Sequence, residues 1–140
     1  MGELLGLPEW LAVSLYLTVA LSAWLTYSYW SIRRAHTRLA LRRANPDEET
    51  FLKLMMTDCS DEAARFVWDQ AHFYVKPRLT PHPDDDLLAD LKIDEDDLML
   101  DWPREWAERK GFHESNFPDW PPAWPATIRN YAKWLDLAPV

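Results

Sequence analysis

The chain has 140 residues and a formal net charge of −8, which leaves room for one globular domain and excludes a second. Five arginines and two glutamates before residue 44 give that part a balance of +3, so residues 44–140 carry −11. A domain this acidic repels nucleic acid, and its field favours basic protein surfaces or cations as partners.

The N-terminal part predicts a membrane-spanning helix. Residues 10–32 are 23 residues without a formal charge, and a helix of that length covers roughly 35 Å, enough to cross a bilayer. Trp10 at one end and Tyr27, Tyr29 and Trp30 at the other lie where interfacial aromatic belts are expected. We therefore expect a single-pass anchor, residues 1–43, followed by an acidic domain, residues 44–140.

A cleaved signal peptide and a buried helix of a soluble protein are the two alternatives to a membrane span. A signal peptide needs basic residues before its apolar stretch, whereas Glu3 and Glu9 precede this one and the five arginines follow it. A soluble core helix seldom runs this far without a charge. The positive-inside rule then places the acidic domain in the cytoplasm. Residues 33–43 are predicted to continue the helix into the headgroup layer, for lipid recognition or for orientation alone.

Helix starts are predicted twice after the anchor. Asn45 is predicted as an N-cap, with Pro46 in the first turn and Glu48 closing a capping box. Ser60 is predicted to open the next helix, and apolar residues recur on one face of each. These residues are Phe51, Leu54 and Met55 in the first helix, and Ala63, Phe66, Val67, Ala71 and Tyr74 in the second.

The following segments are predicted as loops and short helices. Residues 76–83 hold three prolines and predict a loop, and residues 84–91 predict a short turn of helix. The next helix is expected to end at Gly111, and Pro103 must either lie in its first turn or kink it. The apolar faces consist of Leu87, Leu88 and Leu91 in the short turn, and Leu98, Trp102 and Trp106 in the helix.

A last helix is predicted from about Ala126, beyond the proline-rich residues 118–125. Its inward residues are expected to be Ile128, Tyr131, Trp134 and Leu135. No run alternates with the period of a strand over more than a few residues, so the sequence predicts an all-α domain.

The acidic residues between 84 and 101 suggest a calcium site, but the spacing fails. Counted from Asp84, a calcium loop needs an oxygen ligand at its fifth position and glycine at its sixth, and Leu88 and Ala89 stand there. Asp58 and Asp61 beside Cys59 should raise the pKa of its thiol, which favours a structural cysteine over a nucleophile. Because the sequence shows no nucleophile, metal site or cofactor cradle, we expect a non-enzymatic protein without a cofactor.

Residues 79–97 carry a pattern of the form loop, short turn and Asp-Leu-x-Ile-Asp-x-Asp-Asp. This pattern resembles a family of small, uncharacterised bacterial proteins related to acyl carrier proteins, and the resemblance covers about residues 61–117. The matching residues are Asp90, Leu91, Ile93, Asp94, Asp96, Asp97, Trp106 and Phe112. The resemblance implies a bundle of three or four helices and, for the anchored chain, the inner membrane of a bacterium.

The chain departs from this family at three positions. Carrier proteins attach phosphopantetheine to a serine directly after the motif aspartate, and Glu95 occupies that place here. The resemblance therefore implies that phosphopantetheine is not attached. Lys92 stands where glycine is usual, and Pro103 interrupts the helix that carrier proteins use for docking.

Two functional hypotheses follow from the charge and from the tryptophans. In the first, a membrane-tethered adaptor docks a basic protein partner through an acidic face. In the second, a small immunity or regulatory membrane protein, or an accessory subunit of an envelope complex, binds through its Trp-rich C-terminal region, unless those tryptophans only fill the core. The candidate partner-binding residues are Asp90, Asp94, Glu95, Asp96, Asp97 and Asp101 in the first, and Trp120 and Trp124 in the second.

Overall fold

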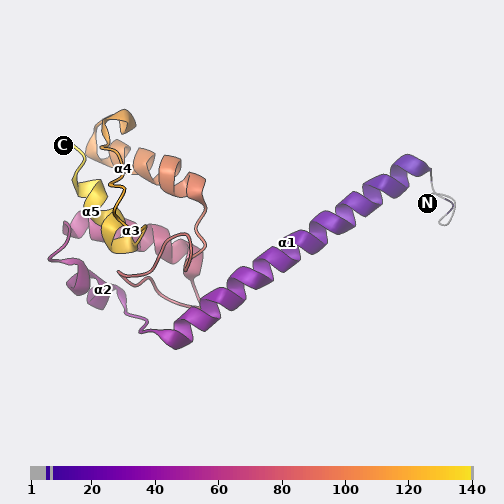
Figure 1. Ribbon diagram of the computed structural model, residues 1–140, viewed down its shortest axis with the longest axis horizontal. Helices are drawn as coiled ribbons and strands as arrows, with labels where there is room; N and C mark the ends of the chain where they lie inside the picture. The colour runs from indigo at the N-terminus through magenta and orange to yellow at the C-terminus, as the bar shows by residue number, and fades with distance from the viewer. Residues whose placement is uncertain (1–5, 7, 140) are drawn as a thin grey trace. The chain divides into compact units, whose positions relative to one another are not determined.

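The computed structural model describes residue 6 and residues 8–139, and over these residues the protein is all-helical, as predicted (Figure 1). The one β-type contact among them is an isolated bridge between Asp86 and Thr127. The α-helices are α1 (Glu9–Arg42), α2 (Glu48–Met55), α3 (Asp61–Val75), α4 (Trp102–Lys110) and α5 (Ile128–Asp136).

Helix α1 is long and apolar enough to cross a membrane. It has 34 residues, and its most apolar window of 18 residues has a mean hydropathy of 1.4 and is only 6% buried within the chain. Four hydroxyl side chains in α1 each donate to the carbonyl four residues earlier, at 2.8 Å, so they bring no unsatisfied polar group into an apolar environment. They belong to Ser14, Thr18, Ser22 and Thr26.

The chain divides into two compact units, Met1–Ala35 and His36–Val140. The sequence suggested a boundary after residue 43, where the charge changes sign. The contacts within the chain place the boundary after residue 35 instead. His36 is buried in the second unit, where its Nε2 lies 2.7 Å from the Leu91 carbonyl oxygen, which places a proton on Nε2. The last turns of α1, predicted as a helical continuation, thus form part of the acidic domain.

The first helix of the domain begins later than predicted. Asp47, not Asn45, is the N-cap of α2, and its carboxylate accepts from the Thr50 N–H at 2.8 Å, which lowers the pKa of Asp47. The Asn45 side chain instead donates to the Ala40 carbonyl near the end of α1. The prediction failed because either side chain can cap, and here the Asn45 amide binds the end of α1 while Asp47 lies at the start of α2.

Helix α3 contacts both α2 and α5 (Figure 1). Ser60 caps α3 as predicted, accepting from the Ala63 N–H at 3.1 Å. The Ser60 hydroxyl also donates to the Asp136 carboxylate at 2.7 Å, which ties the start of α3 to the end of α5. The inward residues predicted for α3 and α5 are buried, except that Tyr74 is only half-buried. In α2, Phe51 and Met55 are buried as predicted, but Leu54 is 44% exposed.

Residues 84–91 form consecutive turns and not the predicted short helix. The Asp86 carboxylate accepts from the backbone N–H groups of Leu88 and Ala89, a local bond that competes with helical pairing. The backbone beside it pairs with the start of α5 instead, since the Leu87 N–H donates to the Ala126 carbonyl at 2.9 Å. Leu88, expected to pack inward, is therefore 40% exposed.

Pro103 is accommodated by a π-helical turn, η2 (Asp97–Asp101), which runs directly into α4. In η2 the Trp102 N–H bonds to the Asp97 carbonyl, five residues earlier. The same pattern would pair the Leu98 carbonyl with residue 103, but proline has no N–H. The Tyr131 hydroxyl of α5 donates to the Leu98 carbonyl instead, at 2.5 Å. Of the two predicted alternatives, a first-turn position and a kink, Pro103 thus adopts the first-turn position in α4. The predicted C-cap is also confirmed, since α4 ends at Gly111 with a left-handed φ of 76°.

Lys92 adopts a left-handed backbone conformation, with φ 59°. A residue with a Cβ atom pays roughly 1–2 kcal/mol for this conformation, and glycine adopts it without that strain but loses more chain entropy on folding.

We expect Lys92→Gly to stabilise the domain by up to about 1 kcal/mol, because relief of strain exceeds the entropic loss. Denaturant unfolding of the full chain in detergent micelles, followed by tryptophan fluorescence, measures the change. The matched control is Lys92→Ala, which removes the same charge but keeps the Cβ atom and should give no gain. Equal stabilisation by both variants would show that the charge, and not the backbone, was responsible.

Candidate functional site

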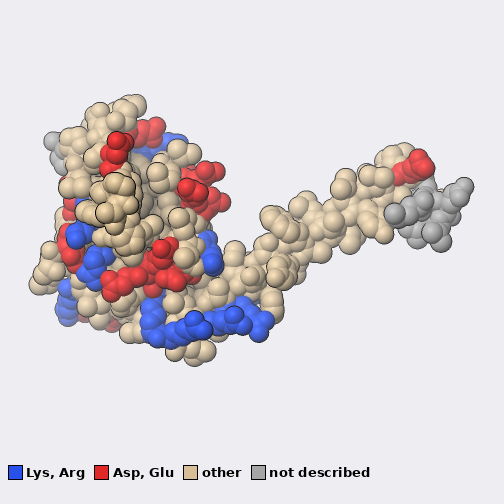
Figure 2. Space-filling model, viewed as in Figure 1, with Lys and Arg blue, Asp and Glu red and all other residues tan. Residues whose placement is uncertain are grey.

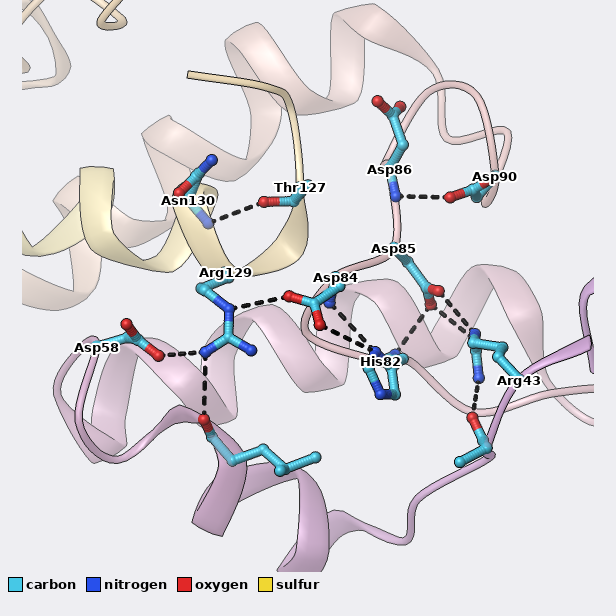
Figure 3. Close-up of polar contacts among 12 residues, drawn as sticks. Arg43, Asp58, His82, Asp84, Asp85, Asp86, Asp90, Thr127, Arg129 and Asn130 are labelled. Atoms are coloured by element: carbon cyan, nitrogen blue, oxygen red, sulfur yellow. Dashed lines mark hydrogen bonds and ion pairs between the residues drawn. The ribbon is translucent and has the colours of Figure 1, made fainter. Parts of the chain in front are cut away.

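Most of the acidic residues between 84 and 101 bind partners within the domain. Asp85 is buried, and both oxygens of its carboxylate accept from Arg43, at 2.7 and 2.6 Å, while the His82 N–H donates to it at 2.9 Å (Figure 3). Burial raises the pKa of Asp85, and the His82 N–H and Arg43 oppose that shift. Arg43 also donates to the Thr80 carbonyl at 2.8 Å, so one arginine at the end of α1 holds the whole loop.

A second arginine, Arg129 of α5, holds the neighbouring acid. It pairs with Asp84 at 3.0 Å and with Asp58, and it donates to the Leu54 carbonyl at 3.3 Å (Figure 3). Arg129 therefore links the loop to the end of α2 as well as to α5. Asp84 and Asp85 are adjacent in the chain, but they bind different elements. Asp84 pairs with Arg129 of α5, and Asp85 pairs with Arg43 at the end of α1.

Four of the six acids predicted to face a partner also have structural roles. Asp90 accepts from the Asp86 N–H at 2.9 Å, and Asp94 from the Asp96 N–H at 3.0 Å. Asp97 accepts from the Tyr74 hydroxyl, and Asp101 pairs with Arg104 at 3.3 Å. The remaining two, Glu95 and Asp96, have exposed side chains that pair with no described cation.

The two predicted tryptophans of the C-terminal region are half-buried. The Trp120 Nε1–H donates to the Trp124 carbonyl at 3.1 Å. The Trp120 ring lies 6.0 Å from the ring centroid of Tyr131 and 5.7 Å from that of Trp134. Trp120 thus packs its inner side on the core and leaves its outer side available.

Glu95 and Trp120, 25 positions apart in the sequence, line the same apolar hollow. Its volume is about 200 Å³, and its other side chains include Leu88, Leu98 and Met99. A second hollow of about 380 Å³ shares Met99 and Trp120 with the first. We call the two together the Met99 groove.

The lining of the Met99 groove contains three acidic side chains and one histidine, His113, but no lysine or arginine. Glu95 lines the first hollow, and Glu114 and Asp119 line the second. Glu114 lies 3.4 Å from Arg104, whereas Asp119 is exposed and pairs with no described cation. The groove therefore combines an apolar floor with at least two uncompensated carboxylates, Glu95 and Asp119.

Met99 and Leu100, two consecutive large apolar residues of η2, are 55% and 54% exposed. A π-helical turn carries one residue more than an α-helical turn and is often found at functional sites. The sequence interpretation did not select these residues. The sequence did contain a signal for them: Met99 and Leu100 are large apolar residues that lie outside the buried face formed by Leu98, Trp102 and Trp106.

Cys59 is not suited to nucleophilic chemistry. Burial raises the pKa of its thiol to about 12, and the charges of Asp136 and Asp58 add to the shift. The raised pKa predicted from the sequence is thus confirmed, although burial rather than Asp61 supplies its main cause.

The described residues contain no group of three or more His, Cys, Asp or Glu side chains arranged to hold a metal ion. No protein-family model matches the chain, and no curated protein or solved structure matches it.

Proposed function

We propose that the protein is a membrane-tethered, non-enzymatic interaction module. Helix α1 crosses the inner membrane of a bacterium once, and the acidic domain lies on the cytoplasmic side. There the Met99 groove docks a segment of a protein partner that carries apolar side chains flanked by lysine or arginine.

The properties of α1 support the anchor. Its apolar window has almost no burial within the chain, so a surrounding hydrocarbon phase would remove that surface from water. Lys and Arg side chains form a row along the C-terminal part of α1, in contrast to the uncharged surface before it (Figure 2). Positive charges at that end favour cytoplasmic orientation under the positive-inside rule.

The observation that carries the docking role is that two segments predicted separately as binding surfaces line one groove. The acidic run contributes Glu95 and Met99, and the Trp-rich region contributes Trp120 and Asp119. Tryptophan and methionine are enriched at protein interfaces, and acidic side chains around an apolar floor select basic partners. The adaptor and the immunity or regulatory hypotheses therefore differ in the partner and not in the surface.

The role of the groove can be tested by cross-linking in membranes followed by purification of the tagged full chain. We expect Met99→Ala/Leu100→Ala and, separately, Glu95→Gln/Asp119→Asn to reduce partner capture by roughly thirtyfold, because losing central interface contacts commonly costs about 2 kcal/mol. Met99 and Leu100 are exposed, and Glu95 and Asp119 form no ion pair with a described residue, so the fold should survive.

The matched control is Asp69→Asn/Glu108→Gln, which removes two exposed acidic charges outside the groove lining. Equal capture by the groove variants and the control would exclude the groove as the docking surface. Protease added to intact spheroplasts tests the orientation, because digestion of the acidic domain from outside would contradict a cytoplasmic location.

A further inference from the structure

The end of α1 exposes an apolar side chain between two arginines. Leu41 is 84% exposed, and Arg38 and Arg42 flank it on the same helix with exposed side chains that pair with no described carboxylate. The opposite face of the same turns is occupied, since His36 bonds to the Leu91 carbonyl and Arg43 binds Asp85. Arg38, Leu41 and Arg42 therefore form a knob directed away from their own domain.

The knob and the Met99 groove are complementary in charge and in apolar character. The groove offers an apolar floor with Glu95 and Asp119 uncompensated, and the knob offers one leucine with two uncompensated arginines. A cavity of roughly 150 Å³ with apolar walls accommodates benzene, so the first hollow, at about 200 Å³, is large enough for a leucine side chain. Opposite charges that flank an apolar contact fix its register and suppress wrong partners.

The knob does not fill the groove of its own chain. None of Arg38, Leu41 and Arg42 is among the residues that line either hollow, and all three belong to the same compact unit as the groove. A knob that fills this groove therefore belongs to another copy of the chain.

We propose that the knob of one copy docks in the Met99 groove of a second copy. Leu41 enters the first hollow against Met99 and Trp120, and Arg38 and Arg42 face Glu95 and Asp119. Different surfaces meet in this contact, so it is heterologous and builds a ring or an open chain of copies. The inference rests on the proposed groove, and the shared membrane anchor raises the effective concentration of one copy near the next.

Site-directed cross-linking between differently tagged full-length copies in membranes tests the contact. One copy carries Thr37→Cys, one helical turn before Leu41, and the other carries Ser115→Cys in the groove lining, so Leu41 and Met99 themselves stay in place. A short bifunctional maleimide joins thiols that lie close together. We expect a product that contains both tags. The native Cys59 reacts slowly because the pKa of its thiol is raised to about 12, and two copies without added cysteines measure its background. Leu137→Cys, at another exposed residue of the domain, replaces Thr37→Cys as the position control.

Charge reversal separates a specific contact from random collision. Arg38→Glu/Arg42→Glu in the Thr37→Cys copy should reduce the product at least tenfold. Glu95→Arg/Asp119→Arg in the Ser115→Cys copy should then restore most of it, and that rescue shows that both variants are folded. Absence of the product in the unreversed pair, a product equal to the Leu137→Cys control, or a failure of charge reversal to reduce it would overturn the proposal.

The result is distinguishable from failure of the proposed docking role. If copies do not cross-link but Met99→Ala/Leu100→Ala still loses another protein partner, the groove binds a foreign segment and only self-docking is wrong. If the groove variants change neither readout, the groove itself is not a docking surface.

Discussion

Replacing Arg43 with methionine is expected to destabilise the domain by about 3–5 kcal/mol, because it leaves the buried Asp85 carboxylate without its cation. Arg43 and Asp85 share two hydrogen bonds, and their side chains are 14% and 3% exposed. The total stability of a domain is about 5–15 kcal/mol, so this loss is a large fraction of it. Denaturant unfolding of the full chain in detergent micelles measures the effect.

A second substitution distinguishes a stranded charge from lost packing. Asp85→Asn in the Arg43→Met background should recover part of the loss, because a neutral amide can still accept from the His82 N–H without carrying a buried charge. The matched control is Arg65→Met, which removes an exposed arginine that pairs with Asp61 and Glu48 on the surface. That change should cost less than about 1 kcal/mol. An Arg43→Met effect no larger than this control would contradict the role assigned to the pair.

Tyr131→Phe is expected to cost about 1–3 kcal/mol, because it removes the hydroxyl that satisfies the Leu98 carbonyl. The phenylalanine ring fills the same space, so the loss reports the hydrogen bond and not a cavity. The same denaturant unfolding experiment measures it. Burial of the hydroxyl, which strongly raises the pKa of Tyr131, keeps it protonated as a donor throughout the neutral range.

A double-mutant cycle tests why the Leu98 carbonyl needs this donor. Pro103→Ala supplies a backbone N–H at the position that the π-helical pattern would pair with Leu98. In that background Tyr131→Phe should cost clearly less than in the native sequence. Equal costs in both backgrounds would show that Pro103 is not the reason for the Tyr131 bond.

Local patterns predicted the helices whose signals lie within a few residues of one another. Ser60 as the N-cap of α3, Gly111 as the C-cap of α4 and the inward face of α5 were all confirmed. In each case the signal is local, because a capping side chain or a periodic apolar face lies within the helix itself. The same reasoning failed at Asn45, because its neighbour Asp47 caps α2 instead. It also failed at residues 84–91, whose backbone pairs with the start of α5.

The candidate site shows the same division. The sequence identified Glu95, Asp96 and Trp120 as possible surface residues, but it also selected Asp94, Asp97 and Asp101, whose carboxylates bind within the domain. Which acid remains uncompensated depends on where Tyr74 and the arginines come to lie. Met99 and Leu100 were missed because helical periodicity identifies the buried face and says nothing of what an exposed apolar residue adjoins.

By itself the sequence determined that this protein is helical, that its first helix is apolar enough for a bilayer, and that its remaining part is acidic. These properties are sums over local windows, since hydropathy, charge and helical period require no knowledge of the fold. The tertiary structure alone decided that Arg43 binds Asp85, that Tyr131 compensates Pro103, and that the acidic run and the Trp-rich region line one groove. Each of these contacts joins residues far apart in the chain, and their energies exist only once packing has excluded water from between them.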